Sequence, residues 1–245
     1  MRTRAIAKLA QTALALLMVG ALAACSGSDG VKVTAPTAAQ QLAAAKVKLD
    51  AASSMHLTLR SSGIPASVNG VLSGDGTGTH APAFKGTLGA RISGFEAKVD
   101  VVAIDTLLYV KLPFTTQFVQ ADPKTYNAPD PAQLFAPQGG ISSLLTDTTD
   151  PVEGPGVRVG PDVLKTITGT LPGTSVVKLL NIGDPTKTFN VTYGITDPGG
   201  ELRTVAMTGP FFKGATSTSV TSTPVTSTYT LTLDKYGAPV EISKP

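Results

Sequence analysis

Alternation of apolar and polar residues between positions 84 and 112 constrains this fold more than any other stretch of the chain. Turn residues divide the stretch into three runs: 84–93, 95–103 and 106–112. In the middle run, small and medium apolar side chains alternate with Glu96, Lys98 and Asp100. Side chains on a strand point to opposite faces with a period of two. The pattern therefore predicts an antiparallel meander with one polar and one apolar face.

The apolar face of this meander lacks the large aromatic side chains that usually fill a core. Its members include Leu88, Ala90, Ile92, Ala97, Val99 and Val101. Helices can cover such a face tightly, which makes it a closed core, or loosely, which leaves room for an apolar guest. The pattern alone favours the closed core and leaves the second alternative open.

Composition places the chain in the α+β class. The 245 residues include 25 Gly, 18 Pro and no Trp, and short apolar runs are broken by turn residues. Such a sequence favours strands with helices set apart from them. The formal charge of +3 comes from 20 basic and 17 acidic residues, and Arg2, Arg4 and Lys8 account for the excess. Without them the charge is balanced, which argues against electrostatically driven nucleic-acid binding.

The first 24 residues have the three parts of a secretory signal. A basic start is followed by an apolar run over residues 9–21 and by small residues. The next four residues, 22–25 (Leu-Ala-Ala-Cys), resemble the bacterial lipobox, which implies a lipid anchor on the thiol of Cys25. A single cysteine also excludes an internal disulfide. We expect a signal peptide over 1–24, a lipidated flexible tether over 25–36 and one domain over 37–245.

The rest of the chain reads as short strands and helices. Thr37 is expected to cap a helix that runs to about residue 54. A turn at 73–76 is expected to end a strand over 67–72. Further strands are predicted at 56–62, 116–120, 157–171, 187–196, 201–209, 226–233 and 239–243, and short helices at 130–135, 141–146 and 174–180.

The proline-rich stretch 114–137 and the short helices near it are a lid or an ordinary crossover, and the sequence favours neither. The candidate lid residues are Leu134, Phe135, Leu144, Leu145, Val176, Leu179 and Leu180. Ten of the thirteen residues 216–228 are Ser or Thr. That tract fits an edge strand pair, a loop or a site for O-linked sugars.

No catalytic or metal-binding pattern is found. The two histidines, His56 and His80, fall in a strand and a turn, and no Gly-x-Ser-x-Gly elbow supplies a nucleophile. Asp147 and Asp150 read as solvated turn residues, and no His-x-x-x-His or calcium loop occurs. We predict no enzyme activity, no cofactor and no metal.

Several segments, taken in order, resemble the LppX/LprA/LprF/LprG family of mycobacterial lipoproteins, and the LprG-like members most closely. They are the lipobox, residues 54–57 (Ser-Met-His-Leu), 72–75 (Leu-Ser-Gly-Asp), 95–112, 130–134 (Asp-Pro-Ala-Gln-Leu) and the ending at 236–245. The stretch 213–228 departs from the family pattern.

The resemblance implies a strongly curved antiparallel sheet, a half-barrel, with helices on its concave side around a hydrophobic cavity. It also implies binding of multi-acylated lipids, such as triacylated glycolipids, lipoglycans or triacylglycerol, and their transport from the plasma membrane toward the outer envelope. A major-facilitator exporter is the implied protein partner, and the outer face of the plasma membrane is the implied location. The expected cavity residues are Leu88, Ala90, Ile92, Ala97, Val99, Val101, Ala103, Leu108 and Val110. An adaptor or scaffold lipoprotein that carries no lipid is the alternative.

Overall fold

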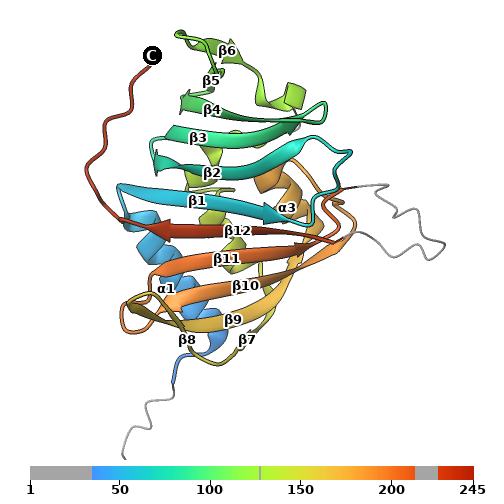
Figure 1. The fold of residues 1–245 in the computed structure, drawn as a ribbon. Coiled ribbons are helices and arrows are strands. Elements are labelled where there is room, and N and C mark those ends of the chain that lie inside the picture. Colours follow the sequence, from blue (N-terminus) through green and yellow to red (C-terminus); the bar gives the residue numbers. More distant parts are fainter. Residues whose placement is uncertain (1–34, 127, 213–225) are drawn as a thin grey trace, which may run out of the picture. The chain divides into compact units, whose positions relative to one another are not determined.

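One long antiparallel sheet runs through the part of the chain that the computed structural model describes, residues 35–126, 128–212 and 226–245. Its strand order is β6-β5-β4-β3-β2-β1-β12-β11-β10-β9-β7, and β8 pairs with β9 off this path. The sheet curves, and its helices lie behind it in the view of Figure 1. The predicted fold class, a curved antiparallel half-barrel with helices on its concave side, is confirmed.

The strands among the described residues are β1 (Ser54–Ser62), β2 (Gly70–Thr79), β3 (Ala83–Ile92), β4 (Phe95–Ile104), β5 (Leu107–Lys111), β6 (Val119–Ala121), β7 (Thr149–Glu153), β8 (Val157–Val159), β9 (Asp162–Pro172), β10 (Thr188–Thr196), β11 (Leu202–Gly209) and β12 (Ser227–Asp234). The helices are α1 (Ala38–Ala51), α2 (Ile141–Asp147) and α3 (Gly173–Leu180), with short 3-10 turns η1 (Pro123–Tyr126) and η2 (Gln133–Phe135). The predicted meander is present as β3, β4 and β5.

Helix α1 starts where the sequence places its cap. The Thr37 side chain accepts a hydrogen bond from the Gln40 backbone N–H, and the Gln40 side chain accepts one from the Thr37 N–H. This reciprocal arrangement satisfies two donors that the helix leaves unpaired. The start of α1 lies at the β7 edge, because Gln41 Nε2 is 2.7 Å from Glu153 Oε2. The buried stripe of Leu42, Ala45 and Leu49 then packs into the core.

The turn predicted at residues 73–76 is wrong, because β2 continues through it to Thr79. Gly74, Gly76 and Gly78 alternate along β2 and share its helix-facing side. Their missing side chains make room for Leu88, Phe84 and Phe135 respectively, since a Cβ at each would crowd those neighbours. Glycine here serves close packing rather than a turn.

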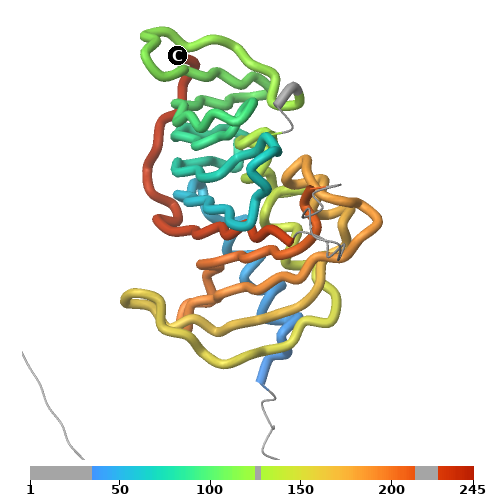
Figure 2. Tube along the Cα trace, turned by 45° about the vertical axis from the view of Figure 1, so that its right-hand side comes forward, coloured from blue at the N-terminus to red at the C-terminus, as the bar shows by residue number. Residues whose placement is uncertain are grey.

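The strand predicted at 239–243 is also wrong. Beyond β12 the chain runs without regular structure along one side of β1–β5, as both Figure 1 and Figure 2 show. Lys244 Nζ lies 3.5 Å from the carboxylate of Asp105 in the β4–β5 turn. The chain end finds no ladder to join, because β1 to β5 are already paired on both sides.

Residues Pro36–Pro245 form one compact unit with a core of their own. The predicted signal peptide, Cys25 and nearly all of the tether lie outside the described residues, as do residues 216–225 of the Ser/Thr-rich tract. Within the described residues, no helix is both long and apolar enough to cross a membrane.

Two buried tyrosines in the core differ in the hydrogen bonds that their hydroxyl groups form. The Tyr193 hydroxyl donates to the Leu144 carbonyl at 3.0 Å and lies 2.7 Å from Thr148 Oγ1. The Tyr229 hydroxyl has no hydrogen-bond partner among the described residues. Burial raises the pKa of both phenols.

We expect Tyr229→Phe to raise the free energy of unfolding by about 1 kcal/mol, because it removes a buried polar atom without a partner. Tyr193→Phe, the matched control, should lower it by about 1–2 kcal/mol through the loss of its hydrogen bonds. Urea unfolding followed by circular dichroism measures both. A Tyr229→Phe variant less stable than the wild type would contradict the conclusion that this buried hydroxyl lacks a hydrogen-bond partner.

Candidate lipid-binding face

The candidate site is the helix-facing side of β3, β4, β5 and β6. The strand register shows which residues share it, because directly paired residues point to the same face. Leu88 of β3 pairs with Val99 of β4. Two residues further along β4, Val101 pairs with Val110 of β5, which in turn pairs with Val119 of β6. All nine predicted cavity residues lie on this one face: Leu88, Ala90, Ile92, Ala97, Val99, Val101, Ala103, Leu108 and Val110.

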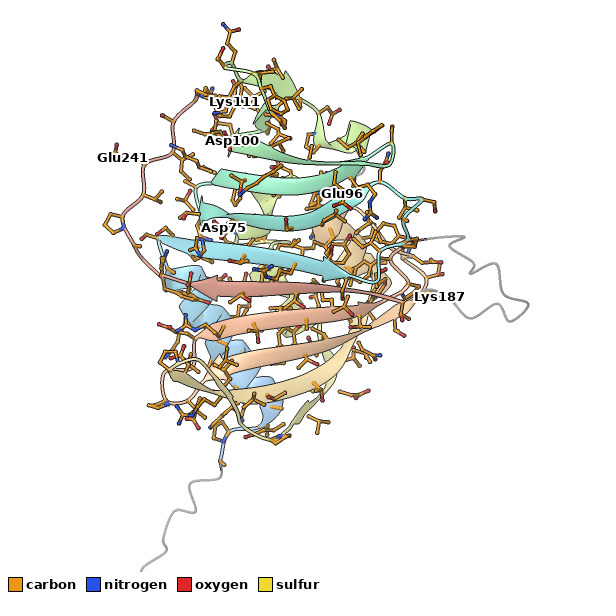
Figure 3. All side chains as sticks on the ribbon, in the orientation of Figure 1. Asp75, Glu96, Asp100, Lys111, Lys187 and Glu241 are labelled. Carbon is orange, nitrogen blue, oxygen red and sulfur yellow. The ribbon has the colours of Figure 1, made fainter. Side chains whose placement is uncertain are left out.

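Polar residues of the same strands occupy the opposite, convex side. Asp100 and Lys111 form an ion pair there with 2.7 Å between carboxylate and ammonium, and Arg91 pairs with Glu96 at 2.6 Å. Figure 3 shows Asp75, Asp100 and Lys111 on the face that it views. The helix-facing side of β4, from Phe95 to Ala103, is wholly apolar.

Burial falls steadily along this apolar face. Ala103, Val101 and Leu108, at one end of their strands, are buried. Leu88, Ala90, Ala97, Val99 and Val110 are half-buried, and Ile92 is exposed at the end where β3 turns into β4. The face is therefore part of the core at one end and open at the other.

At the buried end, aromatic rings fill the space over the glycines of β2. The Phe84 and Phe135 rings stack with centroids 6.0 Å apart, and both are about 2% exposed. Phe84 packs over Gly76 and Phe135 over Gly78. Sequence reasoning took these glycines for a turn. Their spacing of two, the period of a strand, was the signal that identifies them as part of this face.

His80 fixes the segment that carries Phe135. Its Nδ1 lies 2.6 Å from the Phe135 carbonyl oxygen, and its Nε2 lies 2.8 Å from the Leu49 carbonyl oxygen at the end of α1. The other histidine, His56, lies between Asp234 (2.7 Å) and Asp75 (3.4 Å) on the convex side. Neither ring contacts a serine or threonine hydroxyl through a hydrogen bond that the described residues show.

The predicted lid residues are all buried against the sheet or α1. Leu134, Phe135, Leu144, Leu145, Val176, Leu179 and Leu180 are each at most 5% exposed. The segment that crosses the face most directly is the proline-rich one before them. Pro129, Pro131 and Leu134 lie over Leu59 and Leu88. Whether any of these residues moves as a lid stays a prediction.

Two small spaces lie between the sheet and the described covering segments. One has a volume of about 20 Å³ and is lined by Leu57, Leu59, Val71, Gly74, Asp75, Phe84, Leu88, Pro129, Pro131 and Leu134. A neighbour of about 10 Å³ shares Leu59, Val71 and Pro129 with it. A water molecule needs roughly 10–15 Å³ and a ligand pocket about 300–1,000 Å³. The protein's own side chains thus cover the face beneath Pro129 and Pro131.

The sequence profile of the LppX_LprAFG lipoproteins matches residues 37–242. The chain belongs to this family. Among solved structures, LprF from Mycobacterium bovis is similar, with a TM-score of 0.68 and 16% identity over 85% of this chain and 96% of that one. Lipoprotein LppX from Mycobacterium tuberculosis has a TM-score of 0.60 and 20% identity over 86% of this chain and 100% of that one. A comparison with curated protein sequences gives no match.

Membership of a lipoprotein family indicates an exported protein held at a membrane, with a lipid-binding, carrier-type role. The two solved structures support the fold: an open curved sheet with helices on one side. The family resemblance predicted from the sequence is confirmed.

Proposed function

We propose that this protein binds a multi-acylated lipid, such as a triacylated glycolipid, a lipoglycan or triacylglycerol, and carries it from the plasma membrane toward the outer envelope. Its anchor in that membrane would be the lipid on Cys25, at the outer face. The observation that carries the proposal is the uncharged helix-facing side of β3 to β6, which passes from the core at Val101 to solvent at Ile92.

The energetics of acyl chains explain why a carrier needs such a face. Exposing a CH₂ group to water costs roughly 0.8 kcal/mol, so a sixteen-carbon chain costs about 13 kcal/mol. A lipid with two or three such chains does not leave a bilayer unaided on a useful timescale. A protein that offers an apolar face of similar length replaces the water contact. It needs no catalytic group for this, and a handover to an exporter of the major-facilitator type fits the same role.

Binding requires the covering segment to move. The spaces beneath Pro129 and Pro131 are far smaller than one acyl chain, so lipid has to displace this segment together with Leu134 and Phe135. These residues belong to a loop with short 3-10 turns rather than to a long helix. Loops of this kind are the usual low-stability parts of a fold.

Mass spectrometry under native conditions tests the proposal. Residues 26–245, purified from an actinobacterial host, are expected to retain a multi-acyl lipid that solvent extraction identifies. Leu88→Trp should abolish this occupancy, because Leu88 already contacts the small space under Pro131 and a larger ring fills the path of an acyl chain. Thr87→Trp is the matched control: the neighbouring residue pairs with Asp75 on the convex side and should keep the lipid.

The adaptor or scaffold role is the second candidate, and the small volume of the spaces on the helix side favours it. A stable domain that leaves a lipid-rich host empty, with Leu88→Trp indistinguishable from the wild type, would establish that role and overturn the carrier proposal.

A further inference from the structure

The open end of the apolar face carries exposed aromatic side chains. Phe95 is 80% exposed and pairs with Ile92, which is 40% exposed, at the turn between β3 and β4. On the same face, Leu112 follows the end of β5 and is 49% exposed, and Val119 of β6, which pairs with Val110, is 55% exposed. Phe114, in the loop between these two strands, is fully exposed. We call Ile92, Phe95, Leu112, Phe114 and Val119 the apolar tip.

Phe114 sits in a backbone conformation that disfavours it. The Thr115 N–H donates to the Leu112 carbonyl at 3.2 Å, which closes a four-residue turn with Pro113 second and Phe114 third. The φ angle of Phe114 is 66°. Proline at the second position with positive φ at the third is the type II pattern, where glycine normally occupies the third position. The turn thus accepts strain while it holds a large apolar ring in solvent.

We propose that the apolar tip inserts into the surface of a lipid bilayer and is the mouth through which acyl chains pass to the helix-facing side of β3 to β6. This inference rests on the proposed function. Its first support is continuity: Ile92 and Phe95 of the tip belong with the buried residues Val101 and Leu108 to one uninterrupted apolar face. An acyl chain that enters at Phe95 meets only apolar side chains along β4.

Charge is the second support, because it selects lipid over a polar partner. Arg91 and Glu96, which adjoin Ile92 and Phe95 in the chain, pair with each other on the convex side. Lys111 pairs with Asp100 and lies 5.4 Å from the centre of the Phe118 ring. The tip itself thus presents aromatic and aliphatic groups with ammonium and carboxylate groups at its rim, which is the arrangement of side chains at a membrane–water interface.

The position of the tether is the third support. The described chain begins near the β7 edge, whereas the tip extends from β3 to the β6 edge. Seven to ten strand spacings of about 4.8 Å separate β7 from these strands, or roughly 34–48 Å along the curved sheet. Residues 25–35 span up to about 36–40 Å when extended. With Cys25 anchored, the two lengths are comparable, so the domain can turn the tip down onto the same membrane.

Tryptophan fluorescence tests the proposal cleanly, because the chain contains no Trp. Phe114→Trp, made in residues 26–245, provides a single fluorophore at the tip. Mixed with phosphatidylcholine–phosphatidylglycerol vesicles whose acyl chains are brominated, it is expected to shift to the blue and lose most of its emission. Val159→Trp is the matched control, since Val159 is 45% exposed on β8 beside the opposite edge and should stay unchanged.

A second variant separates membrane contact from folding. Phe114→Gly is expected to leave the thermal midpoint equal or higher, since glycine accepts positive φ without strain. The same variant should float less with vesicles and take up vesicle lipid more slowly than the wild type.

Three outcomes overturn the inference. They are an unquenched Trp at 114, equal quenching at 114 and 159, and a blue shift that needs only a high protein concentration, which would make the tip a contact between two copies. Lipid content by mass spectrometry distinguishes the two proposals. A protein that holds lipid but fails these tests refutes the tip alone, whereas a protein that never holds lipid refutes the carrier function.

Discussion

Replacing Phe135 by alanine is expected to lower the free energy of unfolding by about 3–5 kcal/mol, the usual cost of removing a buried aromatic ring. The ring is 2% exposed, stacks on Phe84 and lies over Gly78, so its removal leaves a cavity at the buried end of the candidate site. Urea unfolding followed by circular dichroism measures the loss. Phe114→Ala serves as the control, because a fully exposed ring contributes no core packing.

The same variant should also change ligand binding. Phe135 stacks on Phe84, which lines the space beneath Pro131, so Phe135→Ala is expected to enlarge that space and to accept an acyl chain more readily than the wild type. A loss of stability below about 1 kcal/mol would mean that the ring does not belong to a packed core. The segment from Pro129 to Phe135 would then already be loose in solution.

Substituting alanine for Gly78 is expected to cost about 1–3 kcal/mol, the range for inserting atoms into a packed core. A Cβ at this position would overlap the Phe135 ring, which is buried. The backbone conformation is no obstacle, since Gly78 is not among the glycines with positive φ. The cost therefore comes from the ring alone.

A double-mutant cycle isolates this contact. Adding Gly78→Ala to the Phe135→Ala variant should cost far less than adding it to the wild type, which gives a coupling energy of about 1–3 kcal/mol. Gly74→Ala is the control, because its nearest neighbours, Leu88 Cδ2 and Leu59 Cβ, stand 3.1 and 3.5 Å from the new Cβ. Equal costs in both backgrounds would show that a contact other than the one with the Phe135 ring requires glycine at 78.

The meander was predictable from the sequence because one of its faces is exposed to solvent and carries polar side chains. Glu96, Lys98 and Asp100 lie on the convex side of β4, and their alternation with apolar residues predicted both the strand and the face on which each residue lies. The same reasoning placed seven of the nine predicted cavity residues, Leu88 to Ala103, on the apolar face. The run 70–79 was harder to interpret, because glycine is a turn signal in isolation and a packing device in a strand. The spacing of two between these glycines favours the strand, and the positions of Phe84 and Phe135 confirm the packing role.

Two features of the candidate site had no local signal. The volume on the helix side depends on how far Pro129 and Pro131 settle onto Leu88, which is a property of three-dimensional packing. The exposure of Phe114 depends on the turn that holds it. A single phenylalanine beside a proline does not indicate from the sequence whether its ring is buried or exposed. The strand prediction at 239–243 was wrong for the same reason: it also depends on the three-dimensional arrangement, because a strand needs a free partner strand as well as a suitable sequence.

The two ends of this open sheet are poor templates for further pairing. At one edge β6 is three residues long, and at the other β7 contains Pro151, which has no N–H, and a register shift between Thr149 and Val152. A long, regular edge would invite a second chain to extend the ladder and begin a fibre. Because both edge strands are short or irregular, many copies of the protein can lie close together on one membrane surface and remain separate molecules.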